Sequence, residues 1–288
     1  TIDRLPSLKG NIDDLREKML SSYPFHPHFL ENAFGIYGSA SHYQGARGVI
    51  YLAATLLREA EKKGWDLITL GCVSPLIEAV ALDLRQLNIN LTDRCEEDLR
   101  QRLKNSPLAE AIMASSLFLS FMPERRGATL EDIALSLLGP YTNFNDIEVG
   151  LRDVETKAWY FDFVEGRYRI VEEPVLRKVI EQKAHELLAT PKGVRQVREK
   201  FIEKMKAFLG AEAFALEDKV RDEEHPVKLV FSSKPISLDI IQEATRGRSW
   251  PNTLVFIGPK RGFEGDVLKD PDFLITIARA VVAETFEV

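Results

Sequence analysis

Three consecutive stretches decide the fold of this chain: YPFHPHF at residues 23–29, GIYGSASHYQGARG at 35–48 and VIYLAATLLREA at 49–60. The third has the spacing of an amphipathic helix, with its apolar stripe expected at Ile50, Ala53, Leu57 and Ala60 and widened by Val49, Leu52 and Leu56. Arg47 falls just inside the N-terminal turn of this helix, so the buried stripe would fix the direction of the guanidinium. A permanently charged, rigid donor fork in such a place suits a phosphate or carboxylate supplied by another surface. The alternative is an ordinary surface arginine near a helix start.

Length and composition indicate a globular protein of about two domains, or three small ones. The 288 residues are 45% hydrophobic and 28% charged, which leaves no case for wholesale disorder. The formal charge of −6 argues against a general polyanion binder. Cys72 and Cys95 lack the spacing of a disulfide framework or zinc site, so a reducing, cytoplasmic compartment is expected. No apolar run approaches the roughly 18–20 residues that span a bilayer, and no signal peptide opens the chain.

The first hundred residues are expected to be almost entirely helical. Besides the Arg47 helix, apolar periodicity predicts helices near residues 12–20, 75–87 and 93–104, with a short strand or extended link at 66–70. His26 and His28 lie among prolines and aromatics without nearby cysteines or carboxylates. A packed or hydrogen-bonded role is therefore favoured over metal binding.

Residues 106–190 are expected to form a winged-helix domain. Ser106 followed by Pro107 caps a first helix, Thr129 with Asp132 starts a second, and Asn145 is the expected cap of a third. Two β-rich runs at 158–163 and 168–171 then predict a hairpin. Three helices followed by a hairpin are typical of a winged helix.

The third helix of this domain is poorly charged for DNA binding. Residues 145–157 contain four acidic side chains against two basic ones, and this balance repels a phosphate backbone. Arg167 and Arg169 of the hairpin are the candidates for weak nucleic-acid contact. Docking of a protein partner is the expected role.

Residues 191–288 are expected to form an α/β domain after a boundary at 190–193. A helix at 195–206 carries both charge signs, which predicts salt bridges between positions four apart. Nearly uniform apolar strands at 227–231 and 253–257, with helices at 238–244 and 273–283, predict a parallel or mixed sheet buried on both faces. The polar turn at 246–253 is interpreted as a connecting loop, with a ligand site as the alternative.

The motifs around Arg47 resemble a family of large, uncharacterised archaeal and bacterial predicted ATPases of the AAA+ class. YPFHP, HYQGARG and the long apolar helix carry the resemblance, which continues in KAWY at 157–160 and GRY at 166–168. The family block reads aromatic-Gln-Arg-Thr-Arg-Gly, so its first arginine is replaced here by Gly45. The resemblance implies that residues 1–105 are a helical AAA+-type lid. It also implies that Arg47, with Gln44 beside it, is the second sensor arginine that approaches the γ-phosphate of ATP.

A nucleotide-hydrolysing core needs a GxxxxGK[ST] loop and an acidic strand end for magnesium, and the sequence contains neither. Together with Thr1 at the start, this predicts the C-terminal portion of a longer protein, in which ATP and magnesium bind an N-terminal ATPase core. That core and a protein docked on the winged helix are the expected partners, with no metal site and no membrane. The alternative function is a stand-alone winged-helix module that binds nucleic acid or docks a protein.

Overall fold

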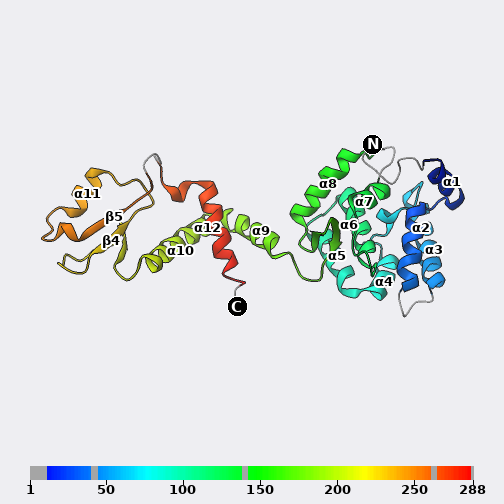
Figure 1. Ribbon diagram of the computed structural model, residues 1–288, viewed down its shortest axis with the longest axis horizontal. Coiled ribbons are helices and arrows are strands. Elements are labelled where there is room, and N and C mark those ends of the chain that lie inside the picture. Colours follow the sequence, from blue (N-terminus) through cyan, green and yellow to red (C-terminus); the bar gives the residue numbers. More distant parts are fainter. Residues whose placement is uncertain (1–11, 40–44, 138–141, 261–264, 287–288) are drawn as a thin grey trace. The chain divides into compact units, whose positions relative to one another are not determined.

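The computed structural model describes residues 12–39, 45–137, 142–260 and 265–286. The chain divides into two compact units, Thr1–Lys178 and Val179–Val288. In the described residues the first unit is mainly helical with one β-hairpin, and the second combines helices with a small parallel sheet (Figure 1). The predicted order, mainly α followed by α/β, is confirmed at this level.

The first unit contains helices, one 3-10 turn and a hairpin. Its described elements are α1 (Ile12–Ser22), α2 (Pro27–Ser39), α3 (Gly45–Lys63), η3 (Leu70–Cys72), α4 (Glu78–Leu87), α5 (Ile89–Gln101), α6 (Pro107–Ser120), α7 (Leu130–Leu137), α8 (Phe144–Lys157), β1 (Phe161–Val164) and β2 (Arg167–Ile170). Helix α9 (Leu176–Leu188) leads from this unit into the next.

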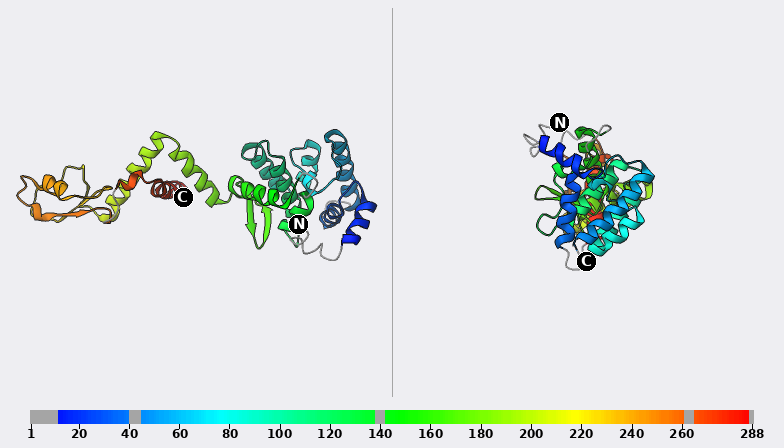
Figure 2. Two further views of the ribbon diagram at one scale, coloured as in Figure 1. Left: turned by 90° about the horizontal axis from the view of Figure 1, so that it is seen from above. Right: turned by 90° about the vertical axis from the view of Figure 1, so that its right-hand side faces the viewer.

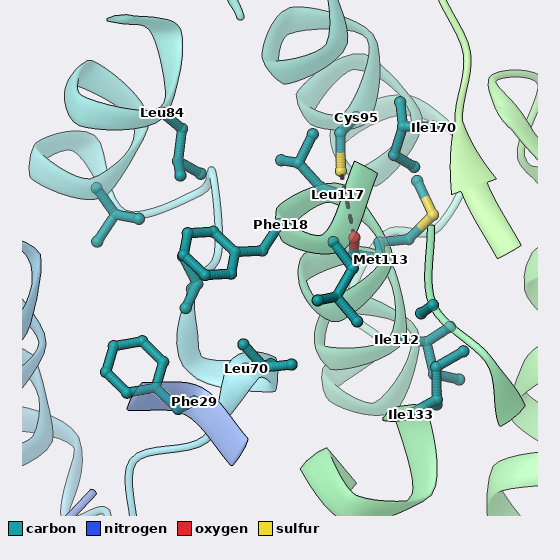
Figure 3. Close-up of a cluster of buried hydrophobic side chains, with 14 of the residues drawn as sticks. Phe29, Leu70, Leu84, Cys95, Ile112, Met113, Leu117, Phe118, Ile133 and Ile170 are labelled. Atoms are coloured by element: carbon teal, nitrogen blue, oxygen red, sulfur yellow. Dashed lines mark hydrogen bonds between the residues drawn. The ribbon is translucent and has the colours of Figure 1, made fainter. Parts of the chain in front are cut away.

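Helix α6 is the centre of the first unit. Ser106 caps it by accepting a hydrogen bond from the amide of Ala109 at 3.2 Å, and Pro107 occupies its first turn. Every residue from 112 to 120 is buried, because the helix packs against η3, α5, α7, α8 and β2. In Figure 3 its Phe118 lies between Phe29 and Leu84, and the rings of Phe118 and Phe29 are 6.4 Å apart. A helix that is apolar on all sides is the expected core of such a unit.

Three helices and the hairpin form the second half of this unit. β1 and β2 pair antiparallel, and an antiparallel bridge between Ala128 and Tyr168 adds a third, short strand-like segment before α7. Gly127 precedes this bridge with a φ of +102°, and a Cβ there would lie 2.6 Å from the carbonyl oxygen of Tyr168. Glycine is therefore required at position 127, where the backbone comes close to the carbonyl oxygen of Tyr168. Figure 2 shows the hairpin projecting from the neighbouring helices.

The start of α8 differs from the prediction by two residues. The cap is Asn143, whose side-chain oxygen accepts the amide of Asp146 at 3.0 Å, while the Asp146 carboxylate accepts the amide of Asn143 at 3.0 Å. Asn145, the predicted cap, lies in the first turn. The helix begins after Asn143 because the reciprocal hydrogen bonds of Asn143 and Asp146 satisfy two backbone amide donors, whereas a lone asparagine cap satisfies one.

Asp98 of α5 joins the first helices to the hairpin. It is fully buried, and its carboxylate accepts the amides of Trp159 at 2.9 Å and Tyr160 at 2.8 Å. Arg102 donates to the same carboxylate at 2.9 Å and stacks 3.7 Å from the Trp159 ring. The domain border expected after residue 105 thus falls inside one hydrophobic core, which extends from Phe29 to Ile170.

The second unit is built around a three-stranded parallel sheet of order β3-β4-β5. Its described elements are α10 (Pro191–Leu209), β3 (Ala213–Ala215), β4 (Lys228–Phe231), α11 (Leu238–Thr245), η4 (Pro251–Thr253), β5 (Leu254–Ile257), η5 (Val267–Lys269) and α12 (Pro271–Ala283), together with most of α9. The predicted strands near residues 227 and 253 are confirmed, and their pairing is parallel, one of the two arrangements expected. β3 was not predicted, because three residues give too short a pattern to recognise.

Two expectations for this unit fail in detail. β5 is an edge strand with Val255 46% exposed, so it is not buried on both faces. In α10, Lys200 pairs with Glu203 three residues away at 2.8 Å. Lys204 and Lys206 instead reach beyond the helix, to Glu284 and to Asp218 respectively. The mixed charge pattern therefore ties α10 to its neighbours more than it forms internal pairs.

Candidate functional site

Arg47 lies in the first turn of α3 and is exposed. The opposite side of this helix is firmly anchored, with Val49, Leu52 and Leu56 at most 3% exposed. α3 packs against α2 and α4. The buried side thus holds the guanidinium on the outer side of the helix, as the sequence predicted. Gln44, predicted beside it, lies outside the residues that the structure describes.

The apolar stripe of α3 is only partly where it was predicted. Ile50 is 66% exposed and Leu57 is 41% exposed, so both are on the outer side, where Tyr51 is 53% exposed. The prediction was wrong for Ile50 and Leu57 because the buried side is centred on positions 49, 52 and 56, and these two residues point away from it. Arg47, Ile50, Tyr51, Leu57 and the exposed Arg58 therefore share one outer surface, called here the Arg47 face.

The Arg47 face combines apolar area with positive charge. Large apolar side chains that gather on an exposed helix side mark a surface for a partner. In the described part of the chain neither Arg47 nor Arg58 has an ion-pair partner. An anion carried by a docked surface could therefore engage Arg47 with both nitrogens of its fork.

The YPFHP segment at residues 23–27 pairs with the chain around Ile68. Phe25 forms a parallel bridge with Ile68, and the amide of His26 donates to the carbonyl oxygen of Ile68 at 2.9 Å. The Nδ1 atom of His26 accepts the amide of His28 at 3.1 Å. Burial, with a smaller effect of His28, lowers the pKa of His26 to about 4. His26 is thus a neutral, packed histidine at physiological pH.

His28 and Arg167 both lie against Asp132 of α7. The Nε2 atom of His28 is 3.3 Å from one carboxylate oxygen of Asp132. The other oxygen accepts the amide and the hydroxyl of Thr129, each at 2.7 Å. Burial acts to raise the pKa of Asp132, but the nearby His28 ring and the hydrogen bonds from Thr129 outweigh it, and the pKa is lowered. These contacts link the YPFHP segment to α7, which is a structural use of His28.

The two hairpin arginines are not freely exposed cations. Arg167 donates to the carbonyl oxygen of Gly127 at 3.0 Å and lies 4.0 Å from Asp132. Arg169 is half-buried and lines a cavity together with Arg126. The sequence could not reveal the surroundings of Arg167 and Arg169, because their neighbours lie about forty positions away in the chain.

The third helix of the hairpin half presents few cations. Its exposed stripe consists of Asn145, Val149, Arg152 and Thr156, with Val149 57% exposed. Lys157 pairs with Asp153 at 2.7 Å. The surface of α8 is therefore mixed and partly apolar.

The polar turn at 246–253 is held by the segment before β4. Arg248 donates to the carbonyl oxygens of Val220 and Arg221, and Asp222 accepts the amides of Ser249 at 2.7 Å and Trp250 at 3.1 Å. The turn is thus hydrogen-bonded to residues 220–222, which favours the connecting-loop interpretation over a ligand site.

Within the part of the chain that the structure describes, the histidine, cysteine and carboxylate side chains form no group that could hold a metal ion, and no helix is long and apolar enough to cross a bilayer. Comparison of the chain with protein-family models, with curated proteins and with solved structures finds no match.

Proposed function

We propose that this chain is the lid and interaction portion of an AAA+-like ATPase, and that Arg47 approaches the γ-phosphate of ATP bound to an N-terminal core. The observation that carries the proposal is the Arg47 face, which presents a guanidinium from an anchored helix start within an exposed apolar surface. Docking on a nucleotide-binding core would cover the apolar side chains and bring Arg47 to a phosphate. ATP and magnesium would be held by that core.

The hairpin half is proposed to be a winged helix. Its order of helix, bridging segment, two helices and hairpin supports this assignment. In the whole protein, hydrolysis would be coupled to rotation of the lid, a hinge-type change. An in-frame GxxxxGK[ST] motif upstream of Thr1 would support this reading, whereas a start codon directly before Thr1 would support a stand-alone module.

This chain by itself is expected to bind ATP with magnesium no more tightly than a Kd of about 1 mM, equivalent to about 4 kcal/mol. The reason is that Arg47 can supply two or three donors, whereas the backbone cradle of a phosphate loop supplies the rest. Isothermal titration calorimetry measures the constant. A micromolar Kd would contradict the division of the site between lid and core.

A second candidate function is protein docking through α8, and the exposed Val149 favours it over DNA reading. A duplex reader neutralises several phosphates, and each contributes about 0.9 to the slope of log affinity against log salt. Arg152 is exposed on α8, whereas Arg167 is engaged with Gly127.

We therefore expect weak duplex binding that does not depend on sequence, with a salt slope no steeper than about −2. Fluorescence anisotropy across a salt series gives the slope. Nanomolar binding near physiological salt with a slope steeper than about −4 would overturn the docking role and point to the basic helix α10.

A further inference from the structure

Helix α3 carries a charge of opposite sign at each end of its outer side. Arg47 stands in the first turn, Glu61 stands in the last turn, and both side chains are exposed. The apolar side chains of the Arg47 face lie between them. Because an α-helix has 3.6 residues per turn, positions 47, 54 and 61 fall on nearly one line along the helix. The partly exposed Ala54 therefore marks the middle of a stripe with a cation at one end and an anion at the other.

Neither of these end charges is paired within the chain. In the described residues Arg47 and Glu61 have no ion-pair partner. Each also stands at the helix end that disfavours it, since the N-terminus of a helix favours anions and the C-terminus favours cations. The first turn of α3 contains no acidic side chain that would compensate. A partner that brings an anion to residue 47 and a cation to residue 61 would satisfy both ends.

A second copy of α3, running antiparallel, meets both requirements. A two-fold axis at Ala54 places Arg47 of each copy opposite Glu61 of the other, so the ion pair forms twice. The same symmetry sets Tyr51 against Leu57 of the other copy and leaves the small Ala54 side chains at the centre, where the helices can approach closely. A parallel arrangement would instead set Arg47 against Arg47 of the other copy, and like charges repel. The order of charges therefore favours an antiparallel pair.

We propose that two copies of this chain associate through antiparallel α3 helices, with two Arg47–Glu61 ion pairs on either side of the apolar side chains of the Arg47 face. This dimer is inferred from α3 alone and does not depend on the proposed function. One consequence does rest on the proposed function: a chain in the dimer cannot offer Arg47 to a phosphate, so self-association and docking on the ATPase core are alternatives for one surface.

Sedimentation velocity of the intact chain measures the association. Because one helix from each chain makes a small interface, we expect a dimer with a Kd of roughly 10 µM, which a series from about 1 to about 300 µM resolves. A monomer throughout this range would overturn the proposal. It would leave the proposed function in place, because a core can cover the same face.

Charge reversal tests which residues pair. Arg47→Glu and Glu61→Arg should each weaken the dimer by roughly tenfold or more, because each turns two attractive pairs into repulsive ones. The variant with both substitutions should regain the dimer, since each pair forms again with its charges exchanged. Arg125→Glu is the matched control, because it makes the same charge change at an exposed position outside α3 and should leave the Kd unchanged.

A dimer that survives both single reversals, or one that the double variant does not restore, would place the association on another surface and overturn the proposal. The double variant also separates the dimer from the proposed function. In the full-length protein it should associate normally and yet hydrolyse ATP slowly, because a glutamate at position 47 cannot stabilise charge on a phosphoryl group. Normal hydrolysis by a dimeric double variant would contradict the role of Arg47 at the phosphate and leave the dimer standing.

Discussion

Asp98→Ala is expected to lower the free energy of unfolding of the first unit by about 3 kcal/mol, because removal of one partner leaves a buried charge and two amides without their acceptor. The carboxylate accepts the amides of Trp159 and Tyr160 and pairs with Arg102. Burial raises the pKa of Asp98 despite these bonds, so the charge itself is costly and its partners offset the cost. Arg102 also lies 3.3 Å from Glu97. That second pair keeps the expected loss at the lower end of the range of about 3–5 kcal/mol.

Urea denaturation followed by circular dichroism measures the loss, and hydrogen exchange at the amides of Trp159 and Tyr160 locates it. Asp93→Ala is the matched control on the same helix. Asp93 is 51% exposed and pairs with Arg85 at 2.7 Å, so its removal should cost about 1 kcal/mol or less. Equal destabilisation by the two substitutions would show that the link between α5 and the hairpin contributes little.

The sequence predicted most elements of the first unit because their signals are local. Ser106 with Pro107 marks the start of α6, and the uniform apolar run behind them indicates its central place. Such caps and periodicities depend on residues within a few positions. The error at the start of α8 was two residues and came from choosing Asn145 over Asn143.

Contacts between distant residues could not be predicted in the same way. Asp98 reads as one more charge in the charged segment at 93–104, yet it binds amides more than sixty positions away. The same limitation applies to the candidate site. The place of Arg47 at the start of a helix could be predicted from the local sequence. The exposure of Ile50 and Leu57 could not, because it depends on how α2 and α4 cover α3. An apolar residue in a helix predicts burial equally well against its own core and against a partner.

Arg47→Ala in the full-length protein is expected to slow ATP hydrolysis by roughly a thousandfold while the Kd for ATP changes little. The reason is that charge develops on the transferring phosphoryl group, and a guanidinium aimed at it stabilises the transition state more than the bound nucleotide. Steady-state hydrolysis and equilibrium binding of ATP, measured on the same preparation, separate the two effects.

Arg58→Ala provides the control for this prediction, because the substitution removes the same charge. Arg58 is exposed on the Arg47 face and lies farther along α3. If the Arg47 face only attracts an acidic surface, the two substitutions should weaken docking alike and reduce hydrolysis by similar, small factors. If Arg47 contacts the phosphate, its loss should reduce kcat and leave the affinity of lid for core nearly intact, whereas Arg58→Ala should leave kcat unchanged. Normal ATP hydrolysis by the Arg47→Ala variant would show that Arg47 is an ordinary surface arginine. The exposed apolar side chains Ile50, Tyr51 and Leu57 would then form a docking surface that has no part in catalysis.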